Sequence, residues 1–319
     1  MKIAISFLAL QLMAGPGFAE NLRFTQYGTP IPAHTSFDVR WNAPGNPFPP
    51  QTWIYQLLPG ELSPRVASNL MVLCSFTDKD RLGKGTLLNF KSSDGQRRLW
   101  ISEVDGTVHY EVALHYSPTN LSLGIPSAEE AVRLAKNLLP KLGVNLADLD
   151  KKENSSEPDF RIGDSQTMFY VNHAFITNLD WRGVGFRRGI DGASFLSGDT
   201  GGNGDIRFGS GAQIIRIDLS WIKLERVKVY PTVNPDTIMK SLRDGKAVQG
   251  MLRMDIGDID WRNVKTVTIN KASMCYYAGN ILKRSHWAYP FASLWAVVDT
   301  GHGSVDVEID CPIYIESEH

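Results

Sequence analysis

Residues 109–142 have the sequence HYEVALHYSPTNLSLGIPSAEEAVRLAKNLLPKL, and this stretch decides the expected fold. Apolar and polar residues alternate over 109–116, which predicts a half-buried antiparallel strand with one face toward water. Ser127 and Glu130 then match the capping-box pattern that starts many helices. Apolar residues recur at helical spacing over 131–142, so a capped amphipathic helix follows the strand. This combination indicates an α+β fold.

The segments before this stretch carry further strand signals. We expect strands near residues 66–76, 86–91 and 97–103, and the last two are joined by a turn at Asp94-Gly95. Six prolines between residues 44 and 64 predict an extended arm, because proline fixes its own φ and restricts the residue before it. We expect this proline-rich arm to wrap over the first lobe.

The second half of the chain repeats the plan of strands followed by a helix. Alternation over 213–219 predicts a strand with one buried face. Asn234 followed by Pro235 predicts the start of a helix that ends at Gly245. A closing hairpin is expected over residues 291–310. We therefore expect two related lobes of antiparallel sheet, each packed by a helix, with a single continuous sheet as the alternative.

Three segments divide the chain in this interpretation. Residues 1–19 have the pattern of a secretory signal peptide: a basic Lys2, an apolar run too short to span a bilayer, and small residues before Glu20. The N-terminal lobe covers residues 20–160 and includes the arm, and the C-terminal lobe covers residues 161–319. The signal predicts a protein that is secreted, or periplasmic in a Gram-negative host.

The composition argues against several classes of partner. Lys and Arg number 33 and Asp and Glu number 34, so the formal net charge is −1. A balanced chain lacks the positive field that draws proteins to nucleic acid. After residue 19 no apolar run reaches the ~20 residues of a membrane span, while 43% apolar residues suit a globular core. We expect an extracellular peptide, protein or glycan as the partner.

Two covalent modifications would suit an exported protein. Cys275 and Cys311 lie in neighbouring strand-like segments, and we expect them to form a disulfide that leaves Cys74 over. Three buried thiols are the alternative. Asn120 and Asn154 stand in Asn-x-Ser patterns, so both are candidate glycosylation sites in a eukaryotic host.

Two acidic groups are candidate sites. Asp199, Asn203 and Asp205 supply oxygen atoms at a spacing that could hold calcium, although the same residue types build ordinary turns. No other cofactor is expected. Asp258 and Asp260 would share one strand face, where paired carboxylates can act in acid–base hydrolysis; a solvated loop is the alternative.

A set of short motifs runs through residues 186–312. It consists of Arg187-Arg188-Gly189-Ile190-Asp191-Gly192, a glycine-rich turn before Ile206-Arg207-Phe208, Trp221, a helix from Pro235 to Gly245, Tyr276-Tyr277 and Tyr289-Pro290. In these motifs the chain resembles the C-terminal part of secreted proteins with PepSY-like or two-component-accessory-like repeats. The resemblance implies cystatin-like α+β modules with binding or peptidase-regulating roles, many without an assigned function, and it supplies no catalytic residue.

The function expected from the sequence is binding rather than catalysis. The sequence contains no nucleophile elbow, zinc-protease motif, phosphate-binding loop or Cys-x-x-Cys pair. We expect a secreted, non-catalytic protein directed at a peptide, a protease or the cell wall, which contacts its partner through sheet edges and the proline-rich arm. The alternative is a secreted hydrolase that uses Asp258 and Asp260 or a triad assembled from distant residues.

Overall fold

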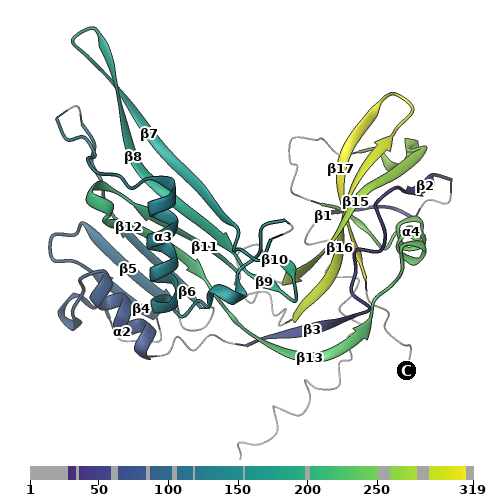
Figure 1. Cartoon of the computed structure of the whole chain (residues 1–319), viewed down its shortest axis with the longest axis horizontal. Coiled ribbons are helices and arrows are strands. Elements are labelled where there is room, and N and C mark those ends of the chain that lie inside the picture. The colour runs from purple at the N-terminus through teal and green to yellow at the C-terminus, as the bar shows by residue number, and fades with distance from the viewer. Residues whose placement is uncertain are drawn as a thin grey trace, which may run out of the picture. The chain divides into compact units, whose positions relative to one another are not determined.

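The computed structural model of the chain is shown in Figure 1. It describes residues 28–33, 36–58, 64–83, 87–102, 106–117, 119–153, 155–197, 202–250, 259–278 and 287–313. These residues form a mostly-β protein of the α+β class, with two sheets, of ten and seven strands, and three α-helices. The expected signal peptide, residues 1–19, lies outside the described residues.

The chain divides into two compact units. Unit 1 consists of the described parts of Met1–Ile54, Arg226–Cys275 and Tyr289–His319, and unit 2 consists of those of Tyr55–Glu225 and Tyr276–Ala288. This division differs from the boundary expected between residues 160 and 161. Strands on both sides of that point belong to one sheet of unit 2, so a local loop signal does not mark the boundary of a unit.

Unit 2 is built around the seven-stranded sheet, in the order β4-β5-β6-β12-β11-β8-β7, with every neighbouring pair antiparallel. Its strands are β4 (Leu87–Lys91), β5 (Arg97–Ser102), β6 (Thr107–Val112), β7 (Phe160–Val171), β8 (Ala174–Arg187), β11 (Asn203–Phe208) and β12 (Ile214–Ser220). Unit 2 also contains the short strands β9 (Gly189–Ile190) and β10 (Ala193–Ser197). The helices α2 (Pro64–Leu73) and α3 (Ala128–Leu138) lie on one face of the seven-stranded sheet (Figure 1).

The helix α3 forms as the sequence predicts. The Ser127 side chain accepts a hydrogen bond from the backbone N–H of Glu130 at 3.2 Å and caps the first turn. The helix buries Ala131, Ala135 and Leu138, which recur at helical spacing. These side chains join the core of unit 2 with apolar residues of the sheet: Phe90, Leu99, Ile101, Val108, Tyr110, Val184, Phe186, Ile206, Phe208, Ile217 and Leu219.

The strand expected at residues 66–76 is wrong, because most of this segment is the helix α2. Pro64 occupies the first position of the helix, where proline is tolerated since its missing N–H has no partner there in any case. Val66 and Leu70, four residues apart, are the buried residues of the helix and join the core of unit 2. Helical spacing of the buried residues therefore outweighs the β-favouring residue types.

The strands β7 and β8 form a hairpin whose outer end projects beyond the other strands of the seven-stranded sheet (Figure 1). The strand β11 pairs with β8 only over Arg182–Arg187. A β-bulge lies between Ser165 and Gln166 of β7 and the facing part of β8. There the buried carboxylate of Asp180 accepts hydrogen bonds from Thr167 Oγ1 at 2.7 Å and from Asn178 Nδ2 at 2.6 Å.

Unit 1 has its own core, which is covered by the helix α4 (Pro235–Arg243). Its strands include β1 (Gly28–Pro30), β2 (Asp38–Trp41), β14 (Val248–Gly250) and β17 (Ser304–Pro312). The expected start of α4 is confirmed, since Asn234 Oδ1 accepts a hydrogen bond from the backbone N–H of Thr237 at 2.9 Å. The side chains of Ile238 and Leu242 are fully buried in this core.

The ten-stranded sheet follows the order β1-β14-β17-β16-β15-β10-β9, and β2, β3 and β13 pair beside this path. Four of its strands have residues in both units: β3 (Gln51–Leu58), β13 (Lys223–Pro231), β15 (Thr266–Ala278) and β16 (Trp287–Asp299). The closing hairpin expected over residues 291–310 is confirmed as β16 and β17, joined by an antiparallel ladder. The strand β3 lies within the proline-rich segment 44–64, so part of the expected arm is regular sheet.

The expected disulfide between Cys275 and Cys311 does not form, and all three cysteines are free and buried. Cys275 lies on β15 and Cys311 on β17, with β16 between them. Two strand spacings amount to about 10 Å, whereas a disulfide requires Cα atoms within about 7 Å. The two cysteines therefore lie on strands that are not adjacent in the sheet. Among the described residues, no helix has the length and apolar character needed to cross a bilayer.

Candidate binding site

The seven-stranded sheet has a second face, opposite α2 and α3, which we call the open face. Successive side chains of a strand point to opposite faces, so the positions that alternate with the core residues lie here. Cross-strand pairing arranges them in rows. One row contains Trp100, His109, Asp218 and Asp205; the next contains Arg98, Glu111, Arg216 and Arg207; a third contains Ser102, Thr107, Ser220 and Asn203.

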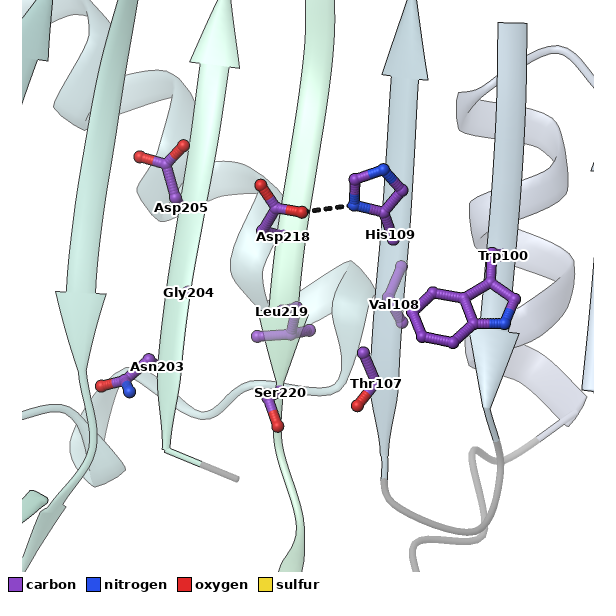
Figure 2. Close-up of a pocket in the computed structure, with 10 residues that line it drawn as sticks. All are labelled: Trp100, Thr107, Val108, His109, Asn203, Gly204, Asp205, Asp218, Leu219 and Ser220. Carbon is purple, nitrogen blue, oxygen red and sulfur yellow. Dashed lines mark hydrogen bonds and ion pairs between the residues drawn. The ribbon is translucent and has the colours of Figure 1, made fainter. Parts of the chain in front are cut away.

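A hollow of about 310 Å³ lies on this part of the sheet (Figure 2). The strands β5, β6, β11 and β12 all contribute to it. Its lining consists of Trp100, Thr107, Val108, His109, Asn203, Gly204, Asp205, Asp218, Leu219 and Ser220. The volume is at the lower end of the range for small-molecule sites, so the hollow suits one small group or one unit of a longer chain.

His109 and Asp218 form the central contact of the hollow. The imidazole Nδ1 donates to Asp218 Oδ1 at 2.5 Å, and the second carboxylate oxygen accepts from Arg216 Nε. The other imidazole nitrogen, Nε2, lies 3.5 Å from Glu111 Oε2. The hydrogen bond to Asp218 raises the pKa of Arg216 above its ordinary value. The Asp218 carboxylate is therefore held by two donors and has a fixed orientation.

Asp205 is held in a similar way on the neighbouring strand. Its carboxylate accepts a hydrogen bond from Arg207 Nε at 2.6 Å, and the guanidinium of Arg207 lies 4.3 Å from the centre of the Trp181 ring. Gly183 makes room for this arrangement, because a Cβ atom there would lie 3.2 Å from Asp205 Oδ2 and 3.1 Å from Trp181 Cζ3. Each carboxylate of the hollow thus has an arginine partner, which leaves little net charge.

Trp100 closes one end of the hollow (Figure 2). Its side chain is 36% exposed, and its ring centre lies 6.4 Å from that of His109 in a T-shaped arrangement. An exposed indole offers a flat apolar surface to a ligand. The neighbouring carboxylate, amide and hydroxyl groups offer donors and acceptors.

The arrangement is suited to binding a polar ligand. Asp205 and Asp218 each lie beside an arginine and are about one-third exposed, so part of each carboxylate faces the solvent. The two carboxylates and the fixed imidazole can accept and donate hydrogen bonds to such a ligand.

The structure describes two of the three residues expected to bind calcium. Asp199 lies outside the described residues, whereas Asn203 and Asp205 belong to β11. The Asp205 carboxylate is paired with Arg207, which already supplies a positive partner. In the described residues, no three or more His, Cys, Asp or Glu side chains are grouped to hold a metal ion.

Of the two carboxylates expected for hydrolysis, the structure describes Asp260 alone. Asp258 lies outside the described residues. Asp260 is exposed and caps a short 3₁₀ helix, where its side chain accepts hydrogen bonds from the backbone N–H of Arg262 at 3.2 Å and from Asn263 Nδ2 at 2.8 Å. This is a structural role.

Of the two glycosylation candidates, Asn120 is exposed and its side-chain amide donates a hydrogen bond to the carbonyl of His115. Asn154 lies outside the described residues.

The pairing of His109 with Asp218 could not be predicted from the sequence, because 109 positions separate the two residues. The one usable signal was the alternation over 109–116, which places His109 on the polar face of its strand. The strand itself ends earlier than expected, at Val112.

Comparison with known proteins assigns neither a family nor a function. No protein-family model matches the sequence, and no curated protein matches it. Among solved structures, the chain is similar to an uncharacterized protein from Eubacterium rectale ATCC 33656, with a TM-score of 0.46, 11% sequence identity and 89% of each chain covered.

Proposed function

We propose that the protein is a secreted, non-catalytic binding protein whose open face holds a neutral glycan of the cell wall. The observation that carries the proposal is the exposed indole of Trp100 at the end of a row of fixed hydrogen-bonding side chains. The location outside the cell, the likeness of residues 186–312 to PepSY-like secreted proteins and a relationship between two cystatin-like lobes belong to the same proposal.

The chemistry of the hollow supports a sugar over other ligands. A pyranose ring has an apolar face that stacks on an indole and a rim of hydroxyl groups that bind carboxylates, amides and other hydroxyls. The hollow offers both kinds of surface within one row, from Trp100 to Asp205. Because Asp205 and Asp218 are each paired with an arginine, the two ion pairs add no net charge that would favour a charged ligand over an uncharged one.

The open shape of the site supports a chain-like ligand. The lining comes from four strands, and its polar side chains and Trp100 stand on the sheet face opposite the two helices (Figures 1 and 2). A polysaccharide can lie across such a face and place one unit in the hollow.

A depletion experiment tests this proposal. The purified protein is mixed with insoluble cellulose, chitin or peptidoglycan, and the fraction left in solution is measured. We expect at least one polysaccharide to retain the protein, and we expect Trp100→Ala to weaken retention about tenfold or more, since the stacking surface is lost.

Trp295→Ala is the matched control, because Trp295 is also 36% exposed but lies on β16. It should retain the full affinity. Absence of binding to all three polysaccharides, or equal loss in both variants, would contradict a glycan site on the open face.

A further inference from the structure

We propose that the outer end of the β7–β8 hairpin inserts into the interface of a lipid bilayer and so anchors the protein peripherally to a membrane. This inference is independent of the glycan site. It rests on the outer end of the ribbon, which projects from the seven-stranded sheet and consists of three apolar residue pairs behind the exposed turn residues Asn172 and His173 (Figure 1).

The exposed apolar side chains of the hairpin gather near its turn. Met168 is 68% exposed, Tyr170 is 64% exposed and Phe175 is 71% exposed. The rings of Tyr170 and Phe175 pair across the ribbon with their centres 5.0 Å apart. Large apolar side chains that are exposed together on a surface mark an interaction site.

The apolar character extends to both faces of the ribbon. The three pairs nearest the turn are Val171 with Ala174, Tyr170 with Phe175, and Phe169 with Ile176, and all six residues are apolar or aromatic. Successive pairs point to opposite faces. A ribbon that docks on a protein needs one apolar face, whereas a ribbon that enters a lipid layer is surrounded and needs two. This observation favours a bilayer over a protein partner.

The polarity changes along the ribbon rather than across it. Behind the three apolar pairs come Met168 with Thr177, Thr167 with Asn178, and Gln166 with Leu179. No Asp, Glu, Lys or Arg occurs from Ser165 to Leu179. Apart from the two turn residues, an apolar section followed by a neutral polar collar matches the order of layers at a membrane surface, where acyl chains give way to headgroups.

The dimensions agree with interfacial insertion. Three pairs span about 10 Å at the rise of a β-strand, and interfacial segments enter to a depth of about 5–10 Å. A two-stranded ribbon has unpaired backbone groups along both edges, and these prevent it from crossing the dry centre of the bilayer. Shallow insertion keeps those groups within reach of water and headgroups.

The lipid involved is a neutral one. The stretch from Ser165 to Leu179 has no Lys or Arg, and the collar ends at Asp164 and Asp180, so the ribbon end itself offers no basic side chain of this kind to attract anionic headgroups. Binding should therefore occur on phosphatidylcholine vesicles and should not weaken as salt is raised, in contrast to binding driven by basic residues.

Vesicle sedimentation tests the inference on the full protein. We expect the wild-type protein to pellet with phosphatidylcholine vesicles, and Phe175→Ser to lower the partition coefficient about tenfold or more. Val72→Ser is the control, because Val72 is 77% exposed on α2, away from the hairpin, and its replacement should change nothing. All variants share one N-terminus, so any lipid affinity of residues 1–19 is common to them.

A second measurement reports the position of the ribbon end directly. Ala174→Cys carries an environment-sensitive fluorophore, and Val72→Cys carries the same label as a control; the native cysteines are buried. Emission from position 174 should shift to the blue on addition of vesicles, and emission from position 72 should not.

Three outcomes would overturn the inference: wild-type protein that stays in the supernatant, equal pelleting of Phe175→Ser and Val72→Ser, or no spectral shift at position 174. A wild-type dimer that Phe175→Ser converts to a monomer, without any binding to vesicles, would assign the ribbon end to self-association instead.

Discussion

His109 on β6 and Asp218 on β12 lie directly opposite each other, and Nδ1 of the imidazole donates to the carboxylate at 2.5 Å. The pair is partly exposed, and Arg216 approaches the same carboxylate from its other side. Because partly solvated ion pairs contribute little to stability, this contact chiefly fixes the direction of two polar side chains in the hollow.

A substitution at Asp218 should therefore affect binding more than stability. Asp218→Ala removes the acceptor that orients both His109 and Arg216, so we expect polysaccharide retention to fall about tenfold while the free energy of unfolding falls by less than about 1 kcal/mol. Depletion assays and chemical denaturation measure the two quantities. Asp38→Ala, which breaks the exposed pair with Arg40 on β2, should leave retention intact; equal loss in both variants would refute the orienting role.

The bulge in the β7–β8 hairpin should depend on Asp180. Asp180 is 4% exposed and accepts hydrogen bonds from the hydroxyl of Thr167 and the amide of Asn178. Asp180→Ala leaves these donors unsatisfied, so we expect a loss of about 2–4 kcal/mol in the free energy of unfolding. Asp164→Ala on the same hairpin removes only a 3.5 Å pair with Arg182 and should cost less than about 1 kcal/mol. Similar denaturation midpoints for the two variants would contradict a structural role for the buried carboxylate.

Gly106 should resist replacement for two separate reasons. Its φ is +66°, and a Cβ atom there would lie 2.4 Å from the backbone oxygen of Trp221. Gly192 has φ +80° with no atom within 4 Å of such a Cβ, so Gly192→Ala isolates the conformational cost of about 1 kcal/mol. We expect Gly106→Ala to lose about 3 kcal/mol or more, measured by urea denaturation. If the two variants lost the same amount, the close approach to Trp221 would have no energetic weight.

The three thiols should be unreactive in the folded protein. Burial raises the pKa of Cys74 and of Cys311 to about 12, and it raises that of Cys275 as well. Since the thiolate is the reactive form, a pKa of 12 leaves about one thiol in 10⁴ ionised at pH 8. Titration with a disulfide reagent at pH 8 should detect no thiol in the native state and three in guanidinium chloride. Detection of a single thiol after denaturation would indicate a disulfide.

The elements that the sequence predicted well are those that local signals define. The helices α3 and α4 begin where Ser127 and Asn234 stand, because an N-cap side chain and the spacing of buried residues act within one or two turns. The closing hairpin followed from alternation on both sides of a glycine turn. Such contacts join residues close in sequence, so a single segment carries the whole signal.

The elements that the sequence missed either lack a clear local period or depend on distant partners. The β7–β8 hairpin escaped prediction because its end is apolar on both faces, and therefore lacks the period of two that marks a half-buried strand. The candidate site required the register of β6 against β12, which joins Glu111 to Arg216 and His109 to Asp218. Register between distant strands is decided by the packing of the whole sheet, which no local window contains.

Unit 1 is built from segments that lie far apart in the sequence, so its strands can pair only after the later segments have been synthesised. Gly28 on β1 pairs with Gly250 on β14, and β14 pairs in turn with β17 near the end of the chain. At ribosomal speeds, about 10–40 seconds separate the appearance of the first two partners. The seven-stranded sheet, in contrast, is drawn from a single stretch that emerges earlier. A stalled or truncated polypeptide would thus expose β1 without its partner strand to quality-control proteases, although all strands of the seven-stranded sheet are already present.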